Sequence, residues 1–316
     1  FDRVGGEPKI NVTPTDAEGK DIGRACSNGE NIAIPVAAPV LCNAEQPYLY
    51  TLTLQAGAET IEQKVGIRTI SVEDGKILIN GKQVKFRGVN RHDSNPYTGA
   101  TVTREDVIRD LQLIKESNVN AIRTSHYPNA PYFPELCSEY GFYMIAEADL
   151  ESHGVGTLYT NDGHDCMGYI AQDDAWAESI LDRQKRNVIR DKNQSAVIFW
   201  SLGNESGYGG NFEDAGRWVK AYDPTRLLHY EASTDNSAGY HNDVSMLDVM
   251  SRMYADTEWV KEYCEDRRMR KPFIQCEFIH AMGNGPGEIH DYMELMYKYD
   301  KFCGGFVWEW CDHATW

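Results

Sequence analysis

The chain has 316 residues, and its 48 acidic and 31 basic side chains give a formal net charge of -17 at pH 7. Such a charge repels phosphate groups, so neither a nucleic acid nor an anionic membrane surface is expected as a partner, whereas a neutral sugar would not be affected. Apolar residues make up 41% of the chain, enough for a sizeable core in one large domain with a smaller one beside it. No apolar run in the sequence is long enough to span a bilayer.

The cysteines and the two ends of the chain say little about its compartment. Eight cysteines are scattered without a C-x-x-C pair, which argues against a zinc ribbon or a redox dithiol and mildly favours a reducing environment. Residues 1–6 contain no initiator Met, basic region or apolar region of a signal peptide, and the chain stops directly after an aromatic run. We therefore expect a fragment of a longer protein, and its localisation, cytoplasmic or periplasmic, is left open.

Residues 1–72 are predicted to form short β-strands separated by turns. Residues 31–36, 48–54 and 60–68 alternate between apolar and polar side chains, and a turn begins at Gly57. A period of two without any helical pattern indicates part of an immunoglobulin-like β-sandwich.

In residues 73–316 the predicted pattern is one of alternating strands and helices. The segment 77–84 is predicted to be a hairpin with Asn80-Gly81 as its turn. Strands are expected near 85–90, 118–124, 142–149, 196–203, 227–232, 244–254, 272–278 and 303–309, and helices near 103–115, 173–191, 212–222, 256–266 and 287–299. Eight such alternations favour a (β/α)8 TIM barrel over an open doubly wound sheet. No G-x-G-x-x-G motif follows the first strand, which argues against a dinucleotide site.

Two glutamates, Glu205 and Glu277, stand where a buried strand gives way to a glycine-rich loop. A carboxylate in this position is desolvated on one side and reachable on the other, which suits an acid, a base or a nucleophile. Glycoside hydrolysis needs two of them: one protonates the leaving oxygen, and the other attacks the anomeric carbon or activates water. The alternative for each is an ordinary loop glutamate in solvent.

Polar and aromatic residues follow the other predicted strands as well, and in a TIM barrel the chemistry lies at these C-terminal strand ends. The guanidinium of Arg123 would favour the ionised form of Glu277. Trp308 offers a flat apolar face to a sugar ring, with core packing as the alternative. The remaining candidates at these ends are His92, His126, Glu151, His153, Tyr254 and His280.

Two sets of these residues suggest a metal. Glu151 and His153 are two positions apart on an extended segment, so their side chains point the same way and with Glu205 could hold Mg²⁺. A hydrogen-bonded pair without metal is the alternative. His92, His126 and His280 leave open a metal-dependent hydrolase, although they lie on separate motifs.

The segments 90–92, 123–128, 201–207 and 277–284 resemble the signatures of family 2 glycoside hydrolases, and within that family most of all the β-galactosidases. The resemblance covers the predicted barrel. It implies a retaining exo-glycosidase that hydrolyses terminal β-D-galactosides by double displacement, with Glu205 as general acid/base and Glu277 as nucleophile. It further implies that Asn204 binds the sugar 2-OH and that Tyr254 hydrogen-bonds the nucleophile. The sugar-hydroxyl ligands that it implies are His92, His126 and His280.

The same resemblance implies cofactors and further domains. The β-galactosidases of the family bind Mg²⁺ through a set like Glu151, His153 and Glu205, and a Na⁺ site is completed by parts that lie outside this chain. Because those parts also complete the galactose pocket, we expect the chain alone to fold but to hydrolyse substrate poorly. Phe278 departs from the Tyr that usually follows the nucleophile. Open alternatives are a β-glucuronidase of the same family, a carbohydrate-binding barrel without catalysis, and a homo-oligomer of the full-length protein.

Overall fold

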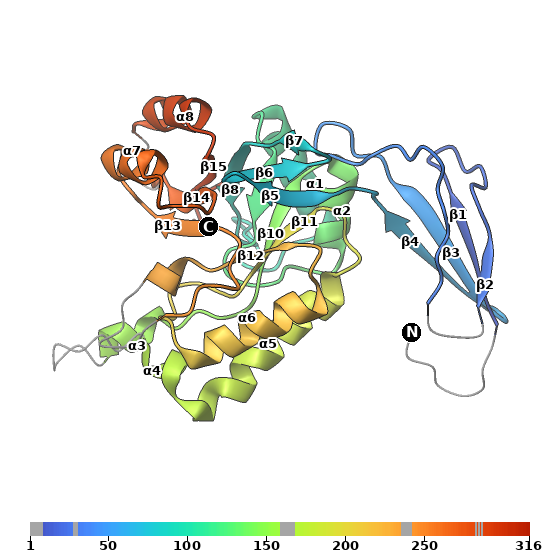
Figure 1. Cartoon of the computed structure of the whole chain (residues 1–316), viewed down its shortest axis with the longest axis horizontal. Helices are drawn as coiled ribbons and strands as arrows, with labels where there is room; N and C mark the ends of the chain where they lie inside the picture. The colour runs from blue at the N-terminus through green and yellow to red at the C-terminus, as the bar shows by residue number, and fades with distance from the viewer. Residues whose placement is uncertain are drawn as a thin grey trace.

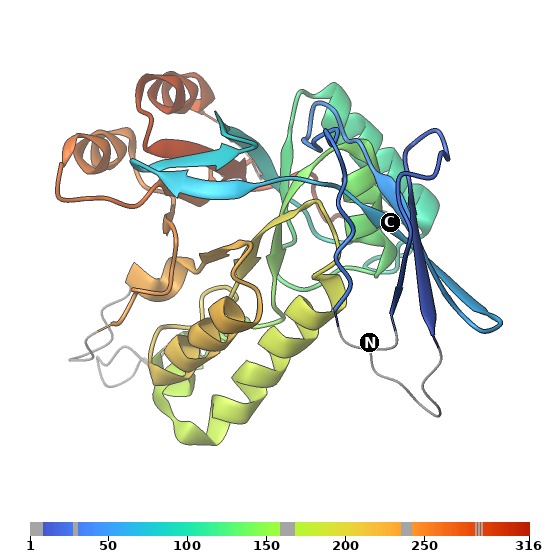
Figure 2. The same cartoon turned by 45° about the vertical axis from the view of Figure 1, so that its right-hand side comes forward.

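The computed structural model describes residues 9–27, 31–158, 168–234, 242–281, 283, 285 and 287–316. An eight-stranded parallel sheet is surrounded by helices, and a four-stranded antiparallel sheet from the beginning of the chain lies to one side of it (Figure 1). Figure 2 shows the molecule turned by 45°, so that the N-terminal sheet comes forward. Within the described ranges, no helix has both the length and the apolar character needed to cross a membrane.

The N-terminal sheet has the order β2-β1-β3-β4, and its neighbouring strands run antiparallel. Its strands are β1 Ile10–Thr15, β2 Ala25–Ser27, β3 Tyr50–Ala56 and β4 Glu59–Val65. The strands predicted at 48–54 and 60–68 are confirmed as β3 and β4. The strand predicted at 31–36 is wrong, because that segment forms no ladder, and its Pro35 has no N–H to donate to one. The immunoglobulin-like character of this part stays a prediction.

The parallel sheet has the order β12-β11-β10-β9-β8-β15-β14-β13 and confirms all eight predicted barrel strands, most of them shorter than expected. The strands are β8 Phe86–Asn90, β9 Ala121–Arg123, β10 Tyr143–Glu147, β11 Val197–Ser201, β12 Leu227–His229, β13 Met250–Met253, β14 Phe273–Phe278 and β15 Phe302–Val307. Between β12 and β13 the described residues form no ladder, but the Asp248 N–H donates to the Leu228 carbonyl across this seam at 3.0 Å. The sheet is therefore a nearly closed TIM barrel.

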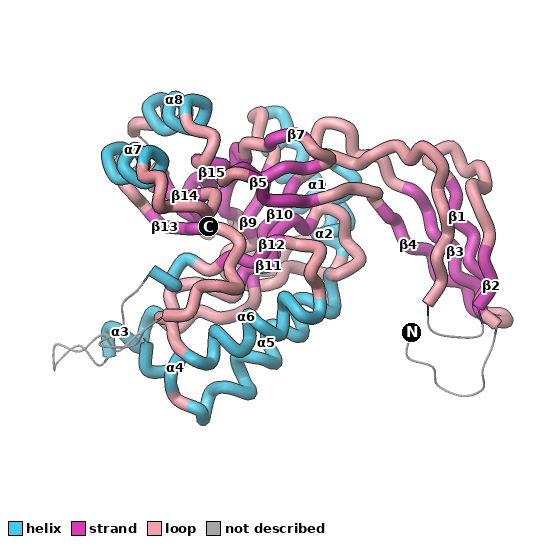
Figure 3. The backbone as a smooth tube through the Cα atoms, in the orientation of Figure 1, coloured by secondary structure: helices cyan, strands magenta, loops and turns pink. Residues whose placement is uncertain are grey.

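The helices pack around the outside of the barrel (Figure 3). They are α1 Arg104–Glu116, α2 Tyr132–Tyr140, α3 His153–Leu158, α4 Gly168–Gln172, α5 Ala177–Asp191, α6 Gly210–Tyr222, α7 Thr257–Glu265 and α8 Ile289–Lys298, with 3₁₀ turns at Asp174–Trp176 and Glu231–Thr234. At the start of α1, Thr103 and Asp106 form a capping box, which explains where this helix begins. Helix α2 is not among the predicted helices; its Pro134 lies in the first turn, where proline is tolerated.

A small sheet closes the N-terminal end of the barrel. It consists of β5 Ile70–Glu73, β6 Lys76–Ile79 and β7 Lys82–Gln83. The predicted turn is confirmed: Asn80 and Gly81 both have positive φ, at 55° and 71°, as a type I′ turn requires. Ile77 and Ile79 are buried and pack with Phe86 in the core inside the barrel. With this end filled by apolar side chains, a site has room at the opposite end, where the predicted residues lie.

Candidate active site

The alternation of side chains along the strands brings a polar layer into the barrel. Ala121, Ile145 and Phe199 belong to the apolar core inside it. Two residues further along the same strands, Arg123, Glu147 and Ser201 therefore also point inward, and all three are fully buried. The register of β10 with β11 places Glu147 beside Ser201. Charged groups thus replace apolar ones where the strands end.

Glu277, at the end of β14, is held by two donors. Arg123 Nη1 donates to Glu277 Oε1 at 2.9 Å, and Tyr254 Oη donates to Oε2, also at 2.9 Å. Burial and the charge of Glu277 raise the pKa of Tyr254, so the phenol keeps its proton and remains a donor. Both contacts stabilise an ionised carboxylate in one orientation, as a nucleophile requires.

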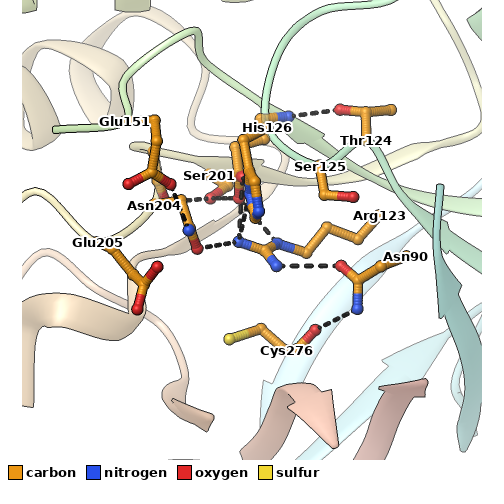
Figure 4. Close-up of polar contacts among 12 residues, drawn as sticks. Asn90, Arg123, Thr124, Ser125, His126, Glu151, Ser201, Asn204, Glu205 and Cys276 are labelled. Atoms are coloured by element: carbon orange, nitrogen blue, oxygen red, sulfur yellow. Dashed lines mark hydrogen bonds and ion pairs between the residues drawn. The ribbon is translucent and has the colours of Figure 1, made fainter. Parts of the chain in front are cut away.

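Glu205 follows β11 in a more open environment, and its side chain is 36% exposed. Its backbone has a φ of +27°, a conformation that a residue with a side chain rarely adopts and that concentrates at functional sites. His153 Nδ1 lies 2.7 Å from Glu205 Oε2, and this contact raises the pKa of His153. Asn204 Nδ2 donates to Glu151 Oε2 at 2.5 Å. Figure 4 shows Glu151, Asn204 and Glu205 on one side of Arg123.

Aromatic rings form another part of the site. The ring of His126 stacks on Trp308 with a centroid distance of 5.2 Å, and the ring of His92 meets Trp308 edge-on at 5.4 Å. Trp308 is half-buried and lies against these imidazoles. His280 is exposed, with its ring centroid 6.2 Å from that of Tyr254.

The structure joins most of the predicted residues by direct contacts but does not gather the three histidines. Among the described residues, the sets that could hold a metal ion are Glu151, His153 and Glu205, and separately His92, Glu309 and His313. His126 and His280 belong to neither set, so the interpretation of the three histidines as one metal centre is not supported by their positions.

Three residues of this region had no role assigned from the sequence: Glu147, Glu309 and His313. His92 Nδ1 lies 2.8 Å from Glu309 Oε2, and His313 Nε2 lies 3.1 Å from the same oxygen. Glu147 forms an ion pair with Arg123. The signal that could have revealed Glu147 is a carboxylate at an inward position of an apolar strand, because a buried charge needs a partner.

Comparison with known proteins identifies the class. The profile of "Glycosyl hydrolases family 2, TIM barrel domain" matches residues 70–316. The chain belongs to glycoside hydrolase family 2. It is 49% identical over 295 residues to the β-galactosidase of Actinobacillus pleuropneumoniae, an alignment that covers 87% of this chain and 29% of that protein. It is 46% identical over 277 residues to the β-galactosidase of Staphylococcus xylosus, covering 87% of this chain and 28% of that protein.

Solved structures with the same fold carry another name. A β-glucuronidase from Ruminococcus gnavus, in complex with uronic isofagomine, matches with a TM-score of 0.80 at 22% identity, covering 98% of this chain and 59% of that one. The β-D-glucuronidase of Dictyoglomus thermophilum matches with a TM-score of 0.78 at 24% identity, covering 96% of this chain and 57% of that one. At these identities the likeness concerns the fold. The chain spans less than a third of the length of the β-galactosidases named above.

Proposed function

We propose that this chain carries the catalytic centre of a retaining β-galactosidase. The observation that carries the proposal is the environment of Glu277, whose two oxygens each accept a hydrogen bond from a different donor, one from Arg123 and the other from Tyr254. The relatives named β-galactosidase support galactose as the sugar of the substrate.

In the proposed mechanism Glu277 attacks the anomeric carbon while Glu205 protonates the leaving oxygen, and a covalent glycosyl-enzyme forms. Glu205 then removes a proton from water, which displaces Glu277 from the anomeric carbon, so two inversions retain the configuration. Asn204 Oδ1 accepts a hydrogen bond from Arg123 at 2.7 Å, which fixes the amide for its proposed contact with the sugar 2-OH. His92 and His126 offer ring nitrogens to other hydroxyls, and Trp308 offers its face to the ring.

We also propose that Glu151, His153 and Glu205 hold Mg²⁺. The residues fit this ion, because one ligand atom from each lies within 4.8 Å of the others and two of the three are carboxylate oxygens. A bound Mg²⁺ would supply positive charge that holds the Glu205 carboxylate in place. If so, a chelator lowers turnover without abolishing it, whereas a Glu277→Gln variant shows none in either condition.

The decisive experiment follows the anomeric configuration of the first product by proton NMR, with aryl β-galactoside and aryl β-glucuronide as parallel substrates. We expect β-galactose as the first product and little release from the glucuronide. Cleavage of the glucuronide in preference would assign the β-glucuronidase alternative, and an α-configured first product would contradict Glu277 as the nucleophile. In a crystal structure, a carboxyl separation of about 5–5.5 Å between Glu205 and Glu277 is expected for retention.

We propose further that the 316 residues alone turn over substrate slowly, because the alignments leave more than two-thirds of each relative unmatched. Comparison of kcat/KM for this chain and for the whole enzyme tests this point. Equal values would contradict it. Unchanged sugar binding with no turnover in either form would instead favour a carbohydrate-binding barrel.

A further inference from the structure

Six consecutive strands of the barrel each contribute one buried polar side chain to a single layer below the proposed site. The path runs from β8 through β9, β10 and β11 to β12 and then crosses the seam to β13. In this order the residues are Asn90, Arg123, Glu147, Ser201, His229 and Ser251, and all are 0% exposed. Burying so many polar groups is costly unless every one is hydrogen-bonded. We call these six residues the polar layer.

The hydrogen bonds of the polar layer have a direction. Ser201 Oγ lies 2.7 Å from Glu147 Oε2 and must donate its proton, because an ionised carboxylate only accepts. His229 Nδ1, at 3.0 Å from Ser201 Oγ, therefore donates to that oxygen, and His229 Nε2 accepts from Ser251 Oγ at 2.7 Å. Burial lowers the pKa of His229 to about 3, so its ring is neutral with one donor and one acceptor. In this series of hydrogen bonds, from Ser251 through His229 and Ser201, every proton points toward Glu147.

Glu147 accepts four hydrogen bonds, which fills its capacity. Its Oε2 accepts from Ser201 Oγ and from Arg123 Nε at 2.8 Å. Its Oε1 accepts from Arg123 Nη2 at 3.0 Å and lies 2.8 Å from His126 Nδ1. Burial alone would raise the pKa of Glu147, but the Arg123 charge and the bonds from His126 and Ser201 outweigh it and hold the pKa at about 2. The carboxylate is thus ionised throughout the neutral range.

Arg123 uses all five of its N–H groups. Two donate to Glu147, and the other three donate to Asn90 Oδ1 at 3.0 Å, Glu277 Oε1 at 2.9 Å and Asn204 Oδ1 at 2.7 Å. Figure 4 shows the Arg123 guanidinium between Asn90 and Asn204. Since the guanidinium is planar, its bidentate contact with Glu147 fixes the direction of the N–H that reaches Glu277. The orientation of Glu277 is therefore linked to the orientation of Glu147.

Glu147 also sets the tautomer of His126. In the neutral ring Nδ1 carries the proton that Glu147 accepts, which leaves Nε2 as an acceptor, 3.9 Å from Glu277 Oε1 and able to receive a sugar hydroxyl. One carboxylate thus orients a group beside the nucleophile and a group that faces the sugar.

We infer that Glu147 is a positioning residue of the glycosidase, which through Arg123 and His126 holds Glu277 and a sugar-hydroxyl acceptor in reactive geometry. The inference rests on the proposed role of Glu277 as nucleophile. Glu147 itself touches neither the sugar nor the reacting atoms. The competing explanation is that Glu147 merely neutralises the buried Arg123 charge and so contributes to stability alone.

A Glu147→Gln variant separates the two explanations. Glutamine keeps the shape but presents an NH₂ where two donors now point, so at least one of the four hydrogen bonds is lost. The control is Asp223→Asn, the same chemical change at a buried pair, since Arg226 Nη1 donates to Asp223 Oδ2 at 2.7 Å. This pair precedes β12 and so lies at the opposite end of the barrel from the proposed site. Both variants lose a carboxylate beside a buried arginine, but only Glu147→Gln disturbs the site.

The readout is covalent labelling by an activated 2-deoxy-2-fluoro-β-galactoside, followed by mass spectrometry on folded protein. We expect the labelling rate of Glu147→Gln to fall by about 10²-fold, the effect of a small misplacement of reacting groups, with Glu277 still the labelled residue. Ser201→Ala, which removes one of the four donors, should label more slowly than wild type but faster than Glu147→Gln. Asp223→Asn should label at the wild-type rate.

Labelling of Glu147→Gln at the wild-type rate would overturn the positioning role while leaving the proposed function intact. Absence of labelling in the wild-type whole enzyme would overturn the proposed function, and the positioning role would fall with it. If Glu147→Gln does not fold, an intermediate rate for folded Ser201→Ala supports the inference, and an unchanged rate for it overturns the inference.

Discussion

Tyr254 combines a contact to the proposed nucleophile with a position outside the core. Its hydroxyl donates to Glu277 Oε2, yet 46% of the residue is exposed. A Tyr254→Phe variant should therefore lower kcat by about 10²-fold, the effect of one donor at a centre of developing charge, and leave the free energy of unfolding almost unchanged. Steady-state kinetics and urea unfolding of the same preparation check both values. A parallel loss of stability would indicate a structural role instead.

His229 makes stability depend on pH in a known direction. Burial lowers the pKa of His229 to about 3, against about 6.5 in an unfolded chain. Between these values the unfolded state binds the proton and the folded state does not, so stability falls as the pH falls from about 6.5 toward 3, by at most about 1.4 kcal/mol per pH unit from this group.

Urea unfolding of wild type and His229→Gln between pH 7 and pH 4 tests this dependence. The variant is expected to be less stable at pH 7 but to lose less stability on acidification. The same slope in both proteins would show that other groups cause the acid sensitivity.

At the level of elements, the strands were predictable because each is a short apolar run bounded by polar or glycine residues. The residues 196–203 illustrate the limit of this reasoning, since strand β11 ends at Ser201 although apolar Leu202 follows. The exact end depends on pairing with β10 and β12, which sequence periodicity does not contain. The same reason explains the false strand at 31–36, where an alternating pattern had no partner.

The pairing of β8 with β15 depends on a residue without a side chain. Gly304 lies opposite Phe86, and a Cβ built on it would lie 2.5 Å from both the Cβ and the carbonyl oxygen of Phe86. Because backbone atoms of a buried strand cannot move aside, Gly304→Ala should destabilise the protein by about 1–3 kcal/mol. The control is Gly287→Ala, where no atom of the described residues lies within 4 Å of the added carbon and a change of less than about 0.5 kcal/mol is expected. Thermal unfolding that gives equal values for both would contradict the close-approach argument.

For the whole molecule, the candidate site was predictable as a set of strand ends, because a TIM barrel brings these ends together whatever their distance in sequence. The contacts among them were not. Glu147 appeared as one polar residue in an apolar run, and its partners, Arg123 on the preceding strand and Ser201 on the following one, become visible only when the strands are paired in register. Sequence motifs therefore predict candidate catalytic residues, whereas residues that support them are found only from the contacts in the folded structure.

The connection between the N-terminal sheet and the barrel contains Arg68. We expect Arg68 to contribute less to the free energy of unfolding than Arg226, which is paired with Asp223. Arg68 Nη2 donates to the Val197 carbonyl at 2.6 Å, but its Nε is buried without a hydrogen-bond partner among the described residues, and burial together with the nearby Arg226 charge lowers the pKa of Arg68 to about 10. Arg226 Nε donates to the same carbonyl at 3.0 Å, so that acceptor stays satisfied without Arg68.

Arg68→Met should therefore change the free energy of unfolding by less than about 1 kcal/mol, because it removes a like-charge contact and an unpaired donor along with one redundant hydrogen bond. Arg226→Met should cost about 3–5 kcal/mol, because it leaves the buried Asp223 carboxylate without its cation. Urea unfolding of the two variants measures the difference directly. A loss of several kcal/mol for Arg68→Met would mean that the arginine joins the two parts of the molecule through a net attraction, and would contradict the redundancy of its hydrogen bond.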